Sequence, residues 1–254
     1  MEKEVHFIEP FLRPHPVDLT ECAFPSEARL LVLAPHPDDF DMIGVTLRWF
    51  RDRGNPIFLA VVSLSPGGVD DDFRSPATPE TKAALREDEQ RRSCRYFGLP
   101  EEHLTFLRLA EDAEGHTLEG REGRENRDRV RAHLLGVRPD VVFLPHGNDP
   151  NTGHQRTARL LAGLVPELAP PPAALFCRDP KTVSMRYDLF TPFEEEAEAW
   201  KATLLRFHAS QQQRNLNRRG KGLDERILEN NRSTARDCPG QAPYAEGFEC
   251  AIWK

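Results

Sequence analysis

The chain has few cysteines, and their arrangement excludes a disulfide-stabilised fold. Five occur among 254 residues, they are widely scattered, and no two of them form a C-x-x-C pair. Small secreted domains held by disulfides carry a dense, even-numbered set of cysteines. The sequence therefore predicts reduced, mostly packed thiols.

Long hydrophobic runs are also lacking. No apolar stretch approaches the roughly 18 residues that a membrane-spanning helix needs. The first six residues, Met-Glu-Lys-Glu-Val-His, are polar and do not resemble the apolar region of a signal peptide. We therefore expect a cytoplasmic protein without a membrane partner.

Positive charge is in deficit. Lysine and arginine total 34 against 41 acidic residues, which gives a net charge of −7 and a pI near 5.8. General nucleic-acid binders and binders of anionic membranes need a basic face, so this balance favours a small-molecule substrate. With 39% hydrophobic and 30% charged residues, the composition is that of a globular protein. Residues 1–254 are expected to form one domain, and the oligomeric state, a homo-oligomer included, stays open.

Strand-like and helix-like segments alternate along the chain. Apolar runs that predict strands lie at 29–34, 56–64, 104–109, 140–145 and 173–176. Helices are expected from about 43 to 54 and at 79–97, 121–137, 155–164 and 193–208. This alternation predicts an α/β fold with a mainly parallel sheet and helices on both faces. Residues 1–27 are an N-terminal extension, and the polar segment 209–254 is either a cover over the active-site edge or partly disordered. Its aromatic end, at 244–253, favours packing against the body.

Chemically reactive side chains follow two of the predicted strands. His36, Asp38 and Asp39 follow the first strand, and the segment 146–154 follows the fourth. The carboxyl ends of parallel strands meet at one edge of a sheet, so these segments are expected to converge. Two adjacent anions require a cation, and two histidines with one carboxylate suffice for a catalytic zinc with an open position. Fe(II) accepts the same ligands.

These two segments carry a family resemblance. The run Pro-His-Pro-Asp-Asp at 35–39 resembles the first motif of the PIG-L/LmbE-type zinc-dependent N-deacetylases. The second motif of that family has counterparts at matching offsets in His146, Asp149, Asn151 and His154. Less specific agreements occur at 65–68, at Arg86 and Glu89, and at 244–249, so that the resemblance covers most of the chain. It implies a Rossmann-like fold.

The resemblance also implies roles for individual residues. His36, Asp39 and His154 would hold the metal, and Asp38 would be the general base. Zinc-bound water would attack the carbonyl of an N-acyl group, most simply the N-acetyl group of an amino sugar or its conjugate. Where many relatives have a histidine that stabilises the oxyanion, this chain has Asn151, which can donate a hydrogen bond but no proton. His146 is the alternative donor.

Three positions depart from the family pattern. Phe40 replaces a usual glutamate, Gly153 replaces a frequent aspartate, and Asn151 replaces the histidine. Lost carboxylates behind a metal ligand can cost roughly 10- to 100-fold in metal affinity or activity. A catalytically weakened sugar- or ligand-binding module on the same fold is therefore the alternative to an enzyme.

Several residues have both a functional and a structural interpretation. Asp39 or Asp41 could simply cap the next helix, and His154 could cap the helix at 155–164. Arg86 could contact an anionic or hydroxylated part of the substrate, but an exposed, ion-paired arginine is the ordinary outcome. Asp149 could also bind substrate, but aspartate is equally an ordinary turn former. Gly67-Gly68 fits a phosphate loop or a flexible active-site loop, and the basic stretch 214–219 could bind substrate anions or be solvated. His15 begins a segment that looks like the first motif, but no apolar strand precedes it and a second aspartate is missing. Five other histidines are expected to be surface or packing residues, namely His6, His103, His116, His133 and His208.

Overall fold

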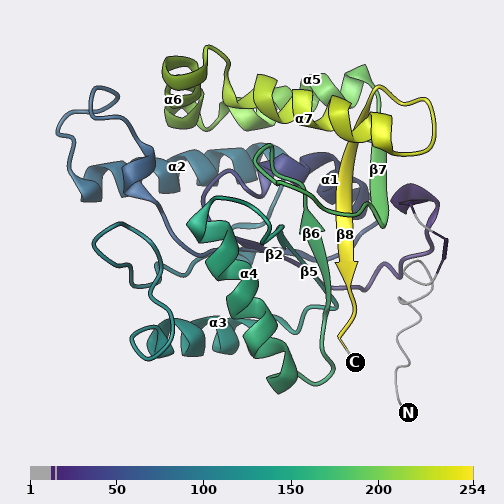
Figure 1. Cartoon of the computed structure of the whole chain (residues 1–254), viewed down its shortest axis with the longest axis horizontal. Coiled ribbons are helices and arrows are strands. Elements are labelled where there is room, and N and C mark those ends of the chain that lie inside the picture. The colour runs from purple at the N-terminus through teal and green to yellow at the C-terminus, as the bar shows by residue number, and fades with distance from the viewer. Residues whose placement is uncertain (1–12, 15, 254) are drawn as a thin grey trace.

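A computed structural model describes residues 13–14 and 16–253. The chain forms one mixed sheet whose strands lie in the order β1-β7-β8-β6-β5-β2-β3-β4 (Figure 1). All neighbouring strands are parallel except β8, which runs antiparallel to both β6 and β7. The strands are β1 (Val17–Asp18), β2 (Leu30–Ala34), β3 (Ile57–Val61), β4 (Leu104–Phe106), β5 (Val141–Pro145), β6 (Ala173–Cys177), β7 (Leu189–Phe193) and β8 (Tyr244–Ala251).

The central strands are hydrophobic on both faces because helices cover both. In β2, Leu30 and Val32 belong to one hydrophobic cluster and Leu31 and Leu33 to another, and all are buried. Successive side chains of a strand point to opposite faces, so a continuous apolar run is what a two-sided parallel sheet requires.

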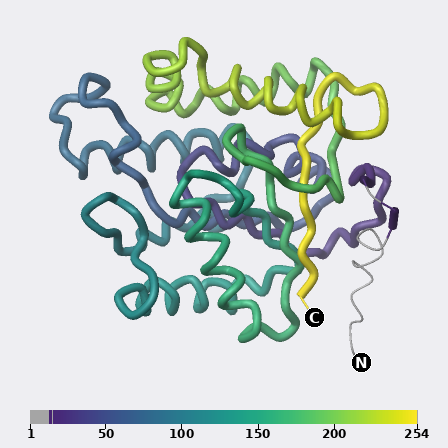
Figure 2. Tube along the Cα trace, viewed as in Figure 1, coloured from purple at the N-terminus to yellow at the C-terminus, as the bar shows by residue number. Residues whose placement is uncertain are grey.

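Helices form layers on the two faces of the sheet. The helices are α1 (Gly44–Asp52), α2 (Pro79–Phe97), α3 (Arg124–Val137), α4 (Thr152–Leu164), α5 (Glu195–Arg206), α6 (Ala209–Arg219) and α7 (Leu223–Asp237). Helices α3 and α4 cover one face, while α1 and α2 lie on the other, beneath α5, α6 and α7 (Figures 1 and 2). Contacts of α5 with α1, α2 and α7 join this outer layer to the body.

The predicted α/β fold and its mainly parallel sheet are confirmed. Helix α2 has the predicted bounds, Pro79–Phe97. It begins with a Thr78 capping box and ends at Gly98, whose φ of 88° is favourable only for glycine. Its inward face is more polar than expected, because Leu85 is only half-buried whereas Arg86 and Glu89 are buried.

The C-terminal part differs most from expectation. The helix predicted at 193–208 begins only at Glu195, because Phe193 ends strand β7. The segment 209–237 is helical, and β8 lies inside the sheet between β6 and β7. Strand β8 escaped prediction because it buries the charged Glu246, whose partner Lys201 lies on a distant helix.

Residues 1–12, 15 and 254 lie outside the described part of the chain, and so do the predictions made for His6 and His15. Among the described residues, no helix combines the length and hydrophobicity that crossing a bilayer requires.

Candidate metal centre and active-site pocket

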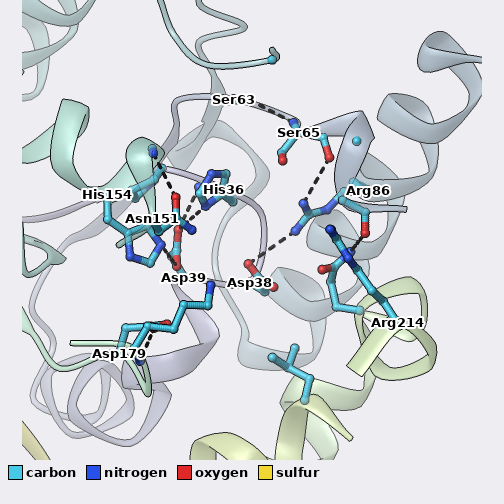
Figure 3. A pocket seen from close by; sticks show the side chains of 18 of the residues that line it. His36, Asp38, Asp39, Ser63, Ser65, Arg86, Asn151, His154, Asp179 and Arg214 are labelled. Atoms are coloured by element: carbon cyan, nitrogen blue, oxygen red, sulfur yellow. Dashed lines mark hydrogen bonds and ion pairs between the residues drawn. The ribbon is translucent and has the colours of Figure 1, made fainter. Parts of the chain in front are cut away.

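The first and second chemical segments meet because β2 and β5 are adjacent and parallel. Their carboxyl ends bring His36, Asp39 and His154 together on one side of a pocket (Figure 3). Each of these three residues offers one ligand atom, and the three atoms lie within 4.8 Å of one another. The sequence prediction that these residues converge is thus met by the geometry.

The spacing of these side chains fits a divalent metal ion. His36 Nδ1 lies 3.4 Å from Asp39 Oδ2, and His154 Nε2 lies 3.5 Å from Asp39 Oδ1. Two ligands bound about 2.1 Å from one tetrahedral ion are separated by about 3.4 Å. Asp39 and His154 are buried, whereas His36 keeps some exposure on the pocket side. Two imidazoles and one carboxylate leave a coordination position open.

Asp149 fixes the orientation of His154. Its Oδ2 lies 2.9 Å from His154 Nδ1, which leaves Nε2 to face Asp39. Asp149 also accepts a hydrogen bond from the backbone N–H of Asn151. The Asp149 carboxylate is buried and is not among the described residues that line the pocket, so its expected contact with substrate stays a prediction. Asp149 thereby provides the supporting carboxylate that the change at Gly153 had put in doubt.

The carboxylate and imidazole side chains of the cluster shift one another's pKa values. Burial would lower the pKa of His154, but Asp39 and Asp149 together raise it to about 10. Burial would raise the pKa of Asp39, yet His154 and His36 hold it well below its usual range. The pKa of His36 is lowered by burial. The two carboxylates thus stabilise positive charge at His154, and a metal ion that replaces the His154 proton would benefit from the same negative charges.

Asp38 is held in an unusual backbone conformation beside the cluster. Its backbone φ is 102°, which lies in a region that residues other than glycine seldom adopt. Its N–H donates to Gln90 Oε1 at 3.0 Å, and its carbonyl accepts from the N–H groups of Asp41 and Met42. These bonds turn the Asp38 carboxylate toward the centre of the pocket, away from the ligand position of Asp39 (Figure 3).

Arg86 holds Asp38 from the opposite side. The arginine is only 2% exposed, and its Nη2 lies 3.4 Å from Asp38 Oδ1 and donates to the carbonyl of Pro37. The alternative of an exposed arginine is therefore wrong. Burial raises the pKa of Asp38, and the Arg86 charge offsets only part of that rise.

Two glycines are required by close approaches at the site. A Cβ on Gly153 would lie 2.6 Å from His36 Nε2, so no side chain fits there without moving a candidate metal ligand. A Cβ on Gly68, in the 3₁₀ turn Pro66–Gly68, would lie 2.8 Å from Arg86 Nη1. Gly67 and Gly68 both line the pocket.

Asn151 lines the pocket and caps α4. Its Oδ1 accepts from the N–H of Gly153 at 2.9 Å, which orients the side-chain amide and leaves the Nδ2 group as a donor. His146, the alternative donor, is not among the described residues that line the pocket. Its Nε2 lies 3.5 Å from Glu249, and its ring packs edge-on against Phe176.

The capping interpretations do not match the structure. Helix α1 begins at Gly44 without a side-chain cap, and the Asp39 carboxylate instead accepts from the N–H of His36. Asp41 lies 2.7 Å from the Nε2 of His208, and both are fully buried. His208 is thus a core residue.

The pocket has a volume of about 410 Å³. Sequence reasoning missed most of the lining that α6, α7 and the loop after β6 supply. The loop brings Lys181 and Asp179 to the pocket, and the Asp179 carboxylate lies beside His154 at the metal end (Figure 3). Gln211, Asn215 and Arg226 line the pocket together with Arg214 from the basic stretch. No spacing pattern in the sequence marks the first five of these, because tertiary contacts alone bring their segments to the pocket.

Solved structures share this fold. N,N'-diacetylchitobiose deacetylase from Pyrococcus horikoshii aligns with a TM-score of 0.69 at 19% identity, over 88% of this chain and 83% of its own. GalB, the 4-carboxy-2-hydroxymuconate hydratase from Pseudomonas putida, aligns with a TM-score of 0.68 at 17% identity, over 90% of this chain and 97% of its own. The A40926 pseudoaglycone deacetylase Dbv21 aligns with a TM-score of 0.66 at 16% identity, over 89% of this chain and 98% of its own. The same fold therefore carries different reactions.

At the sequence level, no curated protein matches the chain. The model of the PIG-L family, described as GlcNAc-PI de-N-acetylase, matches residues 31–165, just over half of the chain. The match contains both segments of the metal centre. The chain therefore belongs to the PIG-L family.

Proposed function

We propose that the protein is a metal-dependent hydrolase that removes an N-acyl group, in the first instance N-acetyl, from an amino sugar or its conjugate. The observation that carries this proposal is the placement of a separate carboxylate, Asp38, beside the His36, Asp39 and His154 cluster in one pocket. A binding module needs no second carboxylate held in a strained conformation. Family membership and the fold shared with deacetylases support the proposal.

His36, Asp39 and His154 would hold the metal, with zinc the expected ion and Fe(II) the alternative. When bound, such an ion polarises a carbonyl oxygen and lowers the pKa of a coordinated water. The protein's own contribution is to fix the two imidazoles. Asp149 does this for His154, and at His36 the Asp39 carboxylate holds the backbone by accepting a hydrogen bond from its N–H at 2.8 Å.

Asp38 would act as the general base and later return the proton to the leaving amine. A raised pKa brings the Asp38 carboxyl closer to the working pH, so that it can both accept a proton from the water and later return it to the amine. Arg86 holds its Oδ1, so that the other oxygen faces the pocket. No other acid is then needed for the amine.

Asn151 would stabilise the oxyanion that develops on the acyl oxygen. Its Nδ2 is the available donor because Oδ1 is engaged by the helix. A single donor of this kind contributes roughly 10²- to 10³-fold to the rate of acyl transfer. The cavity, about 410 Å³, falls within the range of roughly 300–1,000 Å³ typical of small-molecule sites.

Metal analysis combined with an acetate-release assay on a panel of N-acetylated sugars tests this proposal. We expect the wild-type protein to contain metal and release acetate, Asp38→Asn to keep the metal without turnover, and His36→Ala and His154→Ala to lose the metal. Full metal occupancy in both histidine variants would refute the ligand assignment. A metal-replete protein inert across a broad panel would favour the catalytically weakened binding module.

A further inference from the structure

The wall of the pocket opposite the metal centre is rich in arginine. Arg86 comes from α2, Arg214 and Arg218 come from α6, and Arg226 comes from α7. The protein as a whole carries a net charge of −7, so this concentration of positive charge does not follow from its composition. Figure 3 shows Arg86 and Arg214 together on one side of Asp38, with His36, Asp39 and His154 on the other.

Arg214 differs from the other three arginines named above in having no partner among the described residues, and it differs from Arg219, a fifth arginine of the pocket lining, in being half-buried rather than exposed. Arg86 is paired with Asp38, Arg218 lies 3.1 Å from Asp70, and Arg226 donates to Asn215. No hydrogen bond or ion pair joins the half-buried Arg214 to another described side chain. Its guanidinium therefore has its hydrogen-bonding groups free for a ligand.

The surroundings of Arg214 disfavour its charge. Burial, followed by the nearby charge of Arg218, lowers the pKa of Arg214. A Cβ built on Gly68 would lie 3.1 Å from Arg214 Nη1 and 2.8 Å from Arg86 Nη1, so the two guanidinium groups are close neighbours. Asp70 and Asp38 offset part of the repulsion between these cations without pairing with Arg214, so an anion bound at its guanidinium would relieve the rest.

From these contacts we infer that the pocket takes substrates that carry an anionic group, a phosphate or a carboxylate, with Arg214 as its principal contact. Guanidinium groups bind both anions through two parallel hydrogen bonds. The acyl group would lie at the metal end and the anion at the arginine end. As a statement about substrates, this inference rests on the proposed function.

Three substrates that share one acetamido sugar test the inference. They are the methyl glycoside of N-acetylglucosamine, its carboxymethyl glycoside and N-acetylglucosamine 1-phosphate. We expect kcat/KM to be higher for at least one anionic substrate than for the methyl glycoside. Arg214→Gln should reduce that value by roughly 10- to 100-fold more than it reduces kcat/KM for the methyl glycoside, mainly through KM. Arg214→Lys should restore part of the loss.

Arg131→Gln is the matched control for net charge, because Arg131 is an exposed arginine on α3 that pairs with Glu167. It should affect all three substrates alike. Whether the phosphate or the carboxylate substrate gains more identifies the anion. Equal kcat/KM for the three substrates, or an equal loss on all of them in Arg214→Gln, would overturn the inference and leave the deacetylase function intact.

Calorimetry separates this inference from the proposed function. The metal-loaded Asp38→Asn protein should bind N-acetylglucosamine 1-phosphate, and adding Arg214→Gln should weaken that binding by roughly 10- to 100-fold. This result would support the anion site even if no substrate were hydrolysed. Equal affinity of the two proteins for the 1-phosphate would contradict it whatever the activity.

Discussion

The two ends of the pocket are built from different kinds of structure. The metal end consists of short segments, 36–39 and 149–154, that directly follow two parallel strands. The arginine end is assembled from α2 and from the consecutive helices α6 and α7, which follow α2 more than a hundred residues later in the sequence. Residues of the metal end are mutually paired, whereas Arg214 at the other end has no partner in the part of the chain that the structure describes.

This difference shows how chemistry and selectivity can be separated within one site. Side chains at strand ends are placed by the backbone of the central sheet, so their geometry varies little. Helices of the outer layer are placed by packing, and their exposed side chains can change without disturbing the sheet. We therefore expect the metal end to govern turnover and the arginine end to govern the choice of substrate.

Removing the metal gives the largest expected effect. Treatment with a chelator should abolish acetate release, and added zinc or Fe(II) should restore it. Binding of N-acetylglucosamine 1-phosphate to the Asp38→Asn protein, measured by calorimetry, should largely survive the same treatment, because the anion contacts lie at the other end. Loss of that binding together with the metal would contradict the separation of the two ends.

The connection between the two ends depends on the buried Lys201. Its Nζ donates to the Met42 carbonyl, to Asn231 Oδ1 and to Glu246 Oε1 at 2.6–2.7 Å, and thus ties α5 and α7 to the chain after β2 and to β8. Lys201→Met should lower the free energy of unfolding by about 3–5 kcal/mol, because the Glu246 carboxylate stays buried without its cation.

Urea denaturation measures this loss. The double variant Lys201→Met/Glu246→Gln should recover part of it. The exposed Lys221, paired with Glu229, is the control, and Lys221→Met should cost less than about 1 kcal/mol. A loss for Lys201→Met as small as that of the control would show that α5 is held by apolar packing alone.

Asp149→Asn tests how the metal end is supported. An amide cannot hold His154 Nδ1 with the same charge and orientation, so metal affinity should fall by roughly 10- to 100-fold. Competition with a chromogenic chelator measures the affinity. Glu167→Gln, which neutralises an exposed acid outside the pocket, should leave the affinity unchanged. An unchanged affinity in Asp149→Asn would mean that Asp39 alone orients His154.

Gly153→Ala should have the smallest effect. The added Cβ, 2.6 Å from His36 Nε2, must displace that ring, which should cost about 1 kcal/mol of metal-binding free energy. Gly136→Ala is the control, because nothing lies within 4 Å of its added Cβ on α3. That change should leave metal binding intact and stabilise the helix by up to about 1 kcal/mol. Equal metal affinity in both variants would show that His36 can move freely.

Helices, strands and site residues could be predicted where they depend on residues close in sequence, and could not where they depend on contacts between distant segments. Helix α2 was predicted at about its observed bounds, because its stop at Gly98 is a local signal, and the structure adds a second local signal in the Thr78 cap. The convergence of His36, Asp39 and His154 was also predictable, since parallel strands present their ends at one edge. Strand β8 was not, because its burial depends on the Lys201–Glu246 pair, which only the folded chain brings together.

The sequence by itself determined the α/β fold, the family resemblance and the residues expected to hold a metal, because these depend on strand patterning and on short segments at strand ends. It left the partners of these residues open. Only the tertiary structure decided that Asp149 supports His154, that Arg86 is buried against Asp38, and that Arg214 lines the pocket without a partner among residues 13–14 and 16–253. The physical reason is that such roles depend on burial and on neighbours distant in sequence, which local pattern does not encode.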